Sequence, residues 1–201
     1  CAPADENALV GQTETVMQTD YYFRGEELML TDDSGETWVA SGLTTKQLEE
    51  TKAVYGQGNM IPENSVYADG NGMFAVFWGE TPTLHVSKDD GETWTDFVFQ
   101  EEYPRLCTSR IVRFLDPENG YVGLGTDWSM GTGGATYIGW THDGGATWET
   151  TPVAVENGWI LSGLAFADQS AGMLTMDEQF GENSWPHVLV TENGGASFAE
   201  I

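Results

Sequence analysis

The feature that most constrains this chain is an eight-residue stretch that occurs four times. The octet SKDDGETW begins at Ser87, and its variants TDDSGETW, THDGGATW and TENGGASF begin at Thr31, Thr141 and Thr191. Successive copies start 50 to 56 residues apart. A fixed motif with a period of this length is typical of repeat proteins, in which each repeat is one supersecondary unit that buries its apolar surface against its neighbours.

The side chains of the octet are those that a tight turn between two strands requires. An Asp at the third position can accept hydrogen bonds from backbone N–H groups of its own loop. A Gly at the fifth position adopts backbone angles closed to other residues, and the aromatic ring at the eighth can anchor the loop on the core. Because Asn193 replaces the Asp in the fourth copy and keeps only its acceptor oxygen, we expect structural rather than catalytic roles. These structural positions are Asp33, Gly35, Trp38, Asp89, Gly91, Trp94, Asp143, Gly145, Trp148, Asn193, Gly195 and Phe198.

The pattern Ser/Thr-x-Asp-x-Gly-x-Thr-Trp/Phe resembles the Asp-box of the bacterial neuraminidase (BNR) repeat, and its four copies extend the resemblance over nearly the whole chain. In that family the box is the turn between the third and fourth strands of a propeller blade. The resemblance therefore implies an all-β fold, a β-propeller with four Asp-box blades of four antiparallel strands each. Sialidases, xyloglucanases, sortilin-like receptors and photosystem assembly factors all carry the box, so the resemblance implies fold more strongly than activity.

A second set of related segments supports the blade interpretation. FLDPENGYVGL (114–124) parallels FADQSAGMLTM (166–176), and each is typical of a strand, a turn and a second strand. We expect an N-terminal tether at residues 1–13 and a propeller at 14–201, with a short helix within 43–56. The expected blades span residues 14–42, 64–100, 109–154 and 160–201. Since most propellers have more than four blades, a four-bladed ring, a segment of a larger propeller and closure by paired chains all stay open, as does the oligomeric state.

The charge of the chain excludes one class of partner. Seven Lys and Arg residues against 32 Asp and Glu residues give a net charge of −25, and such a surface repels the phosphate backbone of nucleic acids and anionic lipid head groups. No apolar run is long enough to span a membrane as a helix. The acidic residues are spread along the chain rather than gathered in a tail, which favours a role in solubility over attraction of a cationic partner or a divalent metal.

The first residue of the chain is Cys1, followed by Ala-Pro-Ala-Asp-Glu-Asn. This start resembles a mature bacterial lipoprotein, in which the N-terminal Cys carries the lipid; the alternative is a chance start. The resemblance implies an extracytoplasmic protein, on the bacterial cell surface or secreted, that contacts a membrane only through a lipid on Cys1.

Large aromatic residues are expected in the loops at one face of the blades, between second and third strands or between consecutive blades. Aromatic rings beside carboxylates suit the stacking of sugar rings and the hot spots of protein interfaces. The alternative is that these side chains merely pack loops onto the ends of strands. The candidate ligand-binding residues are Trp78, Trp128, Trp159, Trp185, Tyr103 and Arg105, beside the acidic residues Glu101, Glu102, Asp127, Asp177, Glu178 and Glu182.

Catalytic and metal sites find little support in the sequence. Sialidases need three converging Arg residues, whereas Arg110 and Arg113 lie three apart in an expected strand and so point to opposite faces. A glycosidase needs two opposed carboxylates at a defined separation. In a chain this acidic, some pair of carboxylates will always lie near that separation, so the composition cannot identify a catalytic pair. His85, His142 and His187 lack the spacing of metal ligands, and calcium, although conceivable between acidic loops, has no binding motif. We therefore expect no cofactor.

The function that the sequence favours is non-catalytic. We expect a binding or scaffolding module that recognises a protein or carbohydrate ligand. The alternatives are a glycoside hydrolase or a fragment of one, and an assembly factor for a membrane complex.

Overall fold

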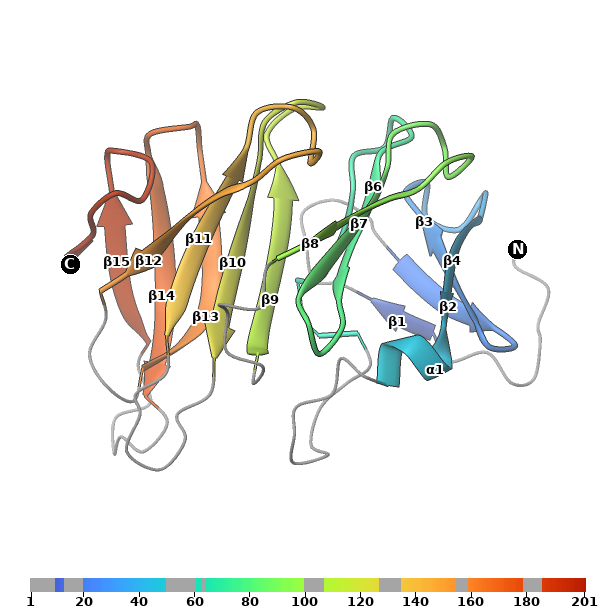
Figure 1. Ribbon diagram of the computed structural model, residues 1–201, viewed down its shortest axis with the longest axis horizontal. Helices are drawn as coiled ribbons and strands as arrows, with labels where there is room; N and C mark the ends of the chain where they lie inside the picture. The colour runs from blue at the N-terminus through green and yellow to red at the C-terminus, as the bar shows by residue number, and fades with distance from the viewer. Residues whose placement is uncertain are drawn as a thin grey trace. The chain divides into compact units, whose positions relative to one another are not determined.

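The computed structural model describes residues 10–12, 20–49, 61–62, 64–99, 107–126, 135–154, 159–178 and 186–201. Its strands form four antiparallel sheets of four strands each, and within every sheet the strands are neighbours in chain order (Figure 1). The expected all-β class and the four four-stranded sheets are thereby confirmed. The chain divides into two compact units, residues 1–103 and 104–201, and each unit contains two of the sheets.

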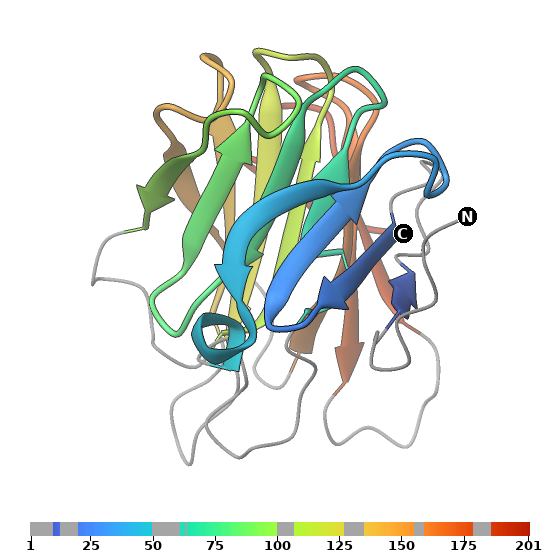
Figure 2. The same cartoon turned by 90° about the vertical axis from the view of Figure 1, so that its right-hand side faces the viewer.

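The first unit contains the first and second sheets. The first sheet consists of β1 (Val10–Gln12), β2 (Asp20–Arg24), β3 (Glu27–Thr31) and β4 (Val39–Thr44), and the second of β5 (Val66–Ala68), β6 (Phe74–Trp78), β7 (Thr83–Ser87) and β8 (Thr95–Val98). The helix α1 (Thr45–Leu48) directly follows β4 (Figure 2). It begins with a capping box, in which Gln47 N–H donates to Thr44 Oγ1 and Thr44 N–H donates to Gln47 Oε1.

The second unit contains the third and fourth sheets. The third sheet consists of β9 (Cys107–Phe114), β10 (Gly120–Thr126), β11 (Thr136–Thr141) and β12 (Glu149–Val153), and the fourth of β13 (Trp159–Phe166), β14 (Gly172–Glu178), β15 (His187–Thr191) and β16 (Ala199–Glu200).

One strand lies where a tether is expected. β1 pairs with β2 across Val10–Gln12, within residues 1–13, so the sheet begins earlier in the chain than the sequence indicates. A strand at the edge of a sheet is held by backbone hydrogen bonds to one neighbour, and its sequence therefore need not alternate between apolar and polar residues.

Each unit has its own apolar core between its two sheets. In the first unit, Leu28 and Leu30 of β3 pack in one cluster with Phe74 and Val76 of β6. In the second unit, the cluster that contains Ile138 of β11 also holds members of all three longer strands of the fourth sheet. Successive sheets of a unit thus bury apolar surface against each other, which is what a repeat of this length requires.

Two glycines of β10 let the third and fourth sheets approach closely. A Cβ atom on Gly123 would lie 3.0 Å from Leu161 Cδ2 and from Leu164 Cδ2, and one on Gly125 would lie 3.0 Å from Leu161 Cβ. These distances are shorter than ordinary van der Waals contact. The small residues of β10 therefore set the spacing between the sheets of the second unit.

The octets form the turns between the third and fourth strands of the sheets. Asp89 accepts hydrogen bonds from Thr93, from its N–H at 2.9 Å and from its hydroxyl at 2.6 Å. Asp143 accepts the same pair from Thr147, at 2.9 and 2.6 Å. Asp33 and Thr37 repeat the arrangement at 2.9 and 2.7 Å.

The other octet positions complete the turn. The hydroxyl at the first position accepts the N–H of the glycine at the fifth, at 3.0 Å for Thr31 and Gly35 and at 2.8 Å for Thr141 and Gly145. The four glycines have φ angles between 78° and 93°, a region that disfavours every residue with a Cβ. The indole N–H of Trp94 donates to Gly91 O at 3.2 Å, and that of Trp148 to Gly145 O at 3.1 Å.

Asn193 shows that the turn needs the oxygen and not the charge. Its Oδ1 accepts the N–H of Ser197 at 3.0 Å, and its Nδ2 donates to the hydroxyl of Ser197 at 2.8 Å. The amide therefore forms the same two contacts as the carboxylates, with the direction of one hydrogen bond reversed.

This equivalence predicts different effects for two substitutions at one position. Asp143→Ala removes the acceptor for Thr147 N–H and Thr147 Oγ1, and we expect it to lower the melting temperature by several degrees. Asp143→Asn retains an acceptor and should keep most of the stability, as Asn193 does. Thermal unfolding followed by circular dichroism measures both. Equal destabilisation by the two substitutions would contradict a turn that depends on the acceptor oxygen.

The same carboxylates predict how stability falls in acid. The hydrogen bonds from Thr147 and Thr141 lower the pKa of Asp143 from 3.8 to about 2, and those from Thr37 and Thr31 lower the pKa of Asp33 equally far. Their stabilising effect is therefore complete above pH 3.8 and is lost as the pH falls through about 2. Between these pH values, the stability of Asp143→Asn should fall less steeply with pH than that of the unmodified chain, as acid unfolding measures. An equally steep fall in both proteins would contradict this prediction.

Candidate functional site

A cluster of aromatic and charged side chains lies at one end of the fourth sheet, and we call its four residues the His187 cluster. Its members are Trp159 at the start of β13, Glu178 at the end of β14, His187 at the start of β15 and Glu200 in β16. His187 Nδ1 lies 2.6 Å from Glu200 Oε1, and His187 Nε2 lies 3.0 Å from Glu178 Oε1. The imidazole stacks on the indole of Trp159 with ring centroids 3.8 Å apart.

The electrostatics of this cluster favour the protonated imidazole. Both ring nitrogens of His187 face carboxylate oxygens, and only the imidazolium can donate to both. The hydrogen bonds that His187 donates to Glu200 and, to a smaller degree, to Glu178 raise the pKa of His187 above 6.5. The stacked Trp159 ring adds a cation–π contact. The imidazolium links all four strands, and with both of its protons engaged it is poorly placed to act as a general base.

The opposite face of β14 carries a small polar set. Ser162 lies at a bulge of β13, between Leu161 and Gly163, and its hydroxyl is 3.1 Å from Thr175 Oγ1 and 3.2 Å from Asp177 Oδ1. Bulges frequently redirect a side chain near functional sites. The end of the fourth sheet therefore carries hydroxyl, carboxylate and aromatic groups, from this set and from the His187 cluster, that could contact a polar ligand.

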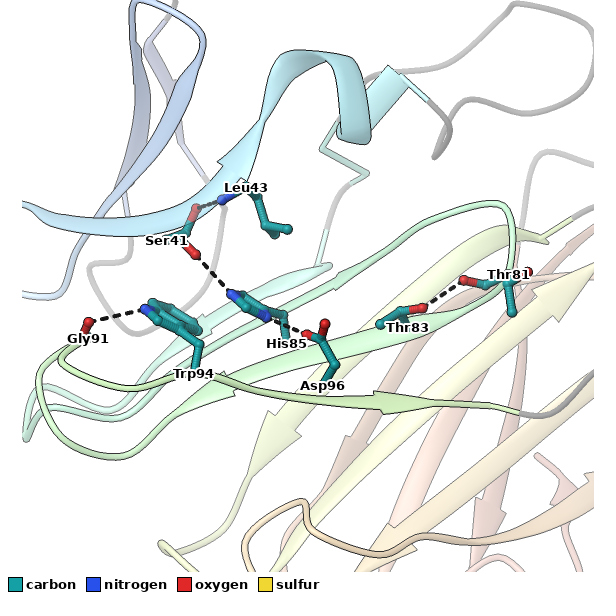
Figure 3. Close-up of polar contacts among 8 residues, drawn as sticks. All are labelled: Ser41, Leu43, Thr81, Thr83, His85, Gly91, Trp94 and Asp96. Atoms are coloured by element: carbon teal, nitrogen blue, oxygen red, sulfur yellow. Dashed lines mark hydrogen bonds and ion pairs between the residues drawn. The ribbon is translucent and has the colours of Figure 1, made fainter.

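A second stacked histidine lies in the first unit and joins its two sheets (Figure 3). His85 of β7 stacks on Trp94 with ring centroids 4.4 Å apart and planes within 3°. Its Nδ1 lies 2.5 Å from Asp96 Oδ1, and its Nε2 donates to the backbone oxygen of Ser41 in β4 at 2.8 Å. The His85 side chain is only 12% exposed, so this arrangement serves the packing of the sheets rather than the binding of a ligand.

Of the six candidate ligand-binding residues, two lie in the described part of the chain. Trp159 belongs to the His187 cluster. Trp78, at the end of β6, is half-buried and packs against the core of the first unit; its Nε1 is buried and has no acceptor among the described residues. Trp128, Trp185, Tyr103 and Arg105 lie outside the described residues, as does Cys1.

Sequence reasoning missed His187 and His85 as organising residues. The three histidines are far apart in sequence, and none has a ligand-like spacing. Their partners Glu200 and Asp96 come from the following strand, where the pairing register brings them close. The available signal was an acidic residue in the strand after the second and fourth octets, with a histidine in the strand before each of these octets.

Features for metal binding, membrane crossing and thiol chemistry are few in the described ranges. They contain no group of three or more His, Cys, Asp or Glu side chains that could hold a metal ion, and no helix in them is long and apolar enough to cross a bilayer. Burial raises the pKa of the Cys107 thiol to about 11, which keeps it protonated and a poor nucleophile at neutral pH. Arg110 is buried beside it and donates to Cys107 O at 3.1 Å.

Comparisons with known proteins find similarity only among solved structures; no family model and no curated sequence matches the chain. A GH74 enzyme from Niastella koreensis is 16% identical with a TM-score of 0.45, over 90% of this chain and 36% of the enzyme. YCF48 from Cyanidioschyzon merolae is 13% identical with a TM-score of 0.34, over 91% of this chain and 69% of that one. YCF48 bound to a D1 peptide is 15% identical with a TM-score of 0.36, over 96% of this chain and 83% of that one. The chain thus spans about a third of the GH74 enzyme.

The His187 cluster predicts a loss of stability at alkaline pH. Because the folded-state pKa of His187 is raised above 6.5, its stabilising effect is complete below pH 6.5 and is lost as the pH rises through the folded-state value. The melting temperature should therefore fall over this range in the unmodified chain and change less in His187→Gln. His142→Gln is the matched control, since His142 contacts the amide oxygen of Asn119 rather than two carboxylates. The same pH dependence in all three proteins would contradict the assignment.

Proposed function

We propose that this chain is a non-catalytic binding or scaffolding module whose four sheets are blades of a β-propeller of the Asp-box type. The sheets support the blade interpretation because each is a meander in chain order with its octet at the same turn. Within each unit, one sheet packs its apolar face on the next, as blades do.

One observation carries the non-catalytic assignment: in five aspartates, hydrogen bonds within the turn lower the pKa and so keep the carboxylate ionised. Hydrogen bonds within their own loops lower the pKa of these residues, which are Asp33, Asp89, Asp116, Asp143 and Asp168. A glycoside hydrolase instead needs a carboxylic acid whose pKa is raised, so that it can protonate the leaving group. These five side chains therefore support the fold and are unsuited to acid catalysis.

Asp32 is the described carboxyl group with a resolved shift in the opposite direction. Burial raises its pKa, and the nearby charges of Asp33 and Asp69 contribute less. It lies at the second, variable position of the first octet and accepts a hydrogen bond from the backbone of Gly72. Because Asp32 lies in a structural turn, a packing role is a better interpretation than a catalytic role. The experiment below includes a substitution of Asp32.

The ligand that we propose is a protein or a carbohydrate, bound at the end of the fourth sheet where Trp159 lies beside the carboxylate of Glu178. Sugar hydroxyls hydrogen-bond to carboxylates, and aromatic rings contribute contact area to both classes of ligand. We do not propose nucleic acid as the ligand, because the chain has a net charge of −25 and repels a phosphate backbone.

Binding and turnover measurements on one sample test this proposal. The probes are an array of immobilised oligosaccharides, immobilised extracytoplasmic proteins, and 4-nitrophenyl glycosides for hydrolysis. We expect binding to one of the two arrays, an at least tenfold loss in Trp159→Ala (about 1.4 kcal/mol), and no hydrolysis. Val98→Ala, which alters an exposed side chain of the first unit, is the matched control.

Two results would overturn the proposal. Hydrolysis of a glycoside that is abolished by Asp32→Asn or Glu178→Gln would identify an enzyme. Binding that is equally strong in Trp159→Ala would show that the ligand lies elsewhere on the molecule. Binding to proteins without any affinity for sugars would favour the scaffolding or assembly role within the proposal.

A further inference from the structure

His85 lies between two hydrogen-bond acceptors that belong to different sheets (Figure 3). Its Nε2 faces Ser41 O of β4 at 2.8 Å, and its Nδ1 faces Asp96 Oδ1 of β8 at 2.5 Å. A backbone carbonyl and a carboxylate can only accept, and a neutral imidazole has a single N–H to donate. The two contacts therefore form together only when His85 and Asp96 hold one more proton than a neutral imidazole and a carboxylate do.

The surroundings of the ring suit a positive charge. The His85 side chain is 12% exposed, so water screens its attraction to the Asp96 carboxylate less than it would between two solvated groups. The ring also stacks on Trp94, with centroids 4.4 Å apart and planes within 3°, which gives the imidazolium a cation–π contact. Asp96 is the titratable group that faces the ring from β8, whereas β6 contributes the apolar Val76, the register partner of His85, and β4 the uncharged Ser41.

Ser41 connects the ring to an irregular part of the first sheet. The pairing register of β3 and β4 shifts at this point, as it does at a bulge. The buried Ser41 hydroxyl supplies hydrogen bonds there, since it donates to Leu28 O at 2.9 Å and accepts Leu43 N–H at 3.1 Å. Leu28 and Leu43 belong to the apolar core of the unit, as does Leu48 of the helix that follows β4. The hydrogen bond from His85 therefore joins the second sheet to the segment in which the first sheet ends.

We propose that His85 is a pH-sensitive switch in the first unit: the doubly protonated ring binds β4 and β8 at once, and loss of one proton to water breaks one of the two contacts. A neutral ring with its hydrogen on Nδ1 points the Nε2 lone pair at Ser41 O, and the other tautomer points the Nδ1 lone pair at the Asp96 carboxylate. Either arrangement is repulsive and leaves a polar group without its partner. The contact between the sheets at His85 is therefore complete while the pair holds its extra proton, and it is lost as the pH rises and that proton leaves. The proposal concerns regulation and holds whether or not the chain binds a ligand.

Nuclear magnetic resonance of the full chain with isotope-labelled histidine tests the switch. Long-range proton–nitrogen spectra show which ring nitrogens are protonated at each pH, and comparison with His142→Gln and His187→Gln assigns the His85 signals. We expect one His85 nitrogen to lose its proton as the pH rises. In the same step, hydrogen exchange of the Leu43 amide, which donates to Ser41 Oγ, should accelerate about tenfold beyond the intrinsic effect of pH, because the segment loses a hydrogen bond.

The variant Asp96→Asn separates the charge from the contact. Its amide can donate to Nδ1 of a neutral ring while Nε2–H still donates to Ser41 O, so both contacts survive without the extra proton. The Asp96 side chain is 53% exposed, so the substitution should leave the fold intact, and we expect it to abolish the pH-dependent step in Leu43 exchange. Glu92→Gln is the matched control, since it removes an exposed carboxylate of the second octet in the same unit and should retain the step.

Each outcome decides the proposal. A step in Leu43 exchange that accompanies the His85 proton, disappears in Asp96→Asn and persists in Glu92→Gln supports it. Leu43 exchange that does not change when His85 loses its proton overturns it, and so does a step that Asp96→Asn retains. The first of these contrary results needs only the unmodified chain, so the test stands even where a variant does not fold. A step that vanishes in His187→Gln would assign the effect to the second unit and would also overturn the proposal.

Discussion

The hydrogen bond from the backbone N–H at the seventh octet position to the side-chain oxygen at the third is the interaction on which the rest of the structure depends. It closes the same turn in all four sheets, at 2.9 Å in the first three and 3.0 Å in the fourth. The closed turn places the aromatic residue at the eighth position on the sheet, where Trp94 and Phe198 pack against the cores of their units. Apolar burial between sheets then supplies most of the driving force for folding.

This use of the aspartates limits what the chain can do chemically. A carboxylate that accepts two hydrogen bonds from its own loop is stabilised in its ionised form, and its oxygens are already engaged. The two stacked histidines are constrained in a similar way. His85 bridges β4 and β8 through Ser41 and Asp96, and His187 bridges Glu178 and Glu200. Ionisable groups that other proteins use for catalysis serve here to hold strands together, which favours a binding or scaffolding role.

The sequence predicted the features that depend on local chemistry. The octet showed where each third strand turns into the fourth, and a short helix was expected within residues 43–56, where α1 lies. Features that depend on pairing between distant strands could not be predicted. β1 has no apolar pattern of its own, and the contact of His187 with Glu178 and Glu200 follows from the registers of three strands. Trp78 and Trp159 both pack against the cores of their units, and Trp159 also stacks on His187, a contact that its sequence position does not indicate.

Amide hydrogen exchange at the seventh octet position tests the central role of the turn most directly. The four amides are those of Thr37, Thr93, Thr147 and Ser197, and each donates to the side chain at the third position. They lie near the surface, so without this hydrogen bond they would exchange at nearly the rate of an unfolded peptide. We predict that all four amides exchange slowly and that Asp143→Ala exposes the Thr147 amide alone. Rapid exchange of these amides in the unmodified chain would contradict it.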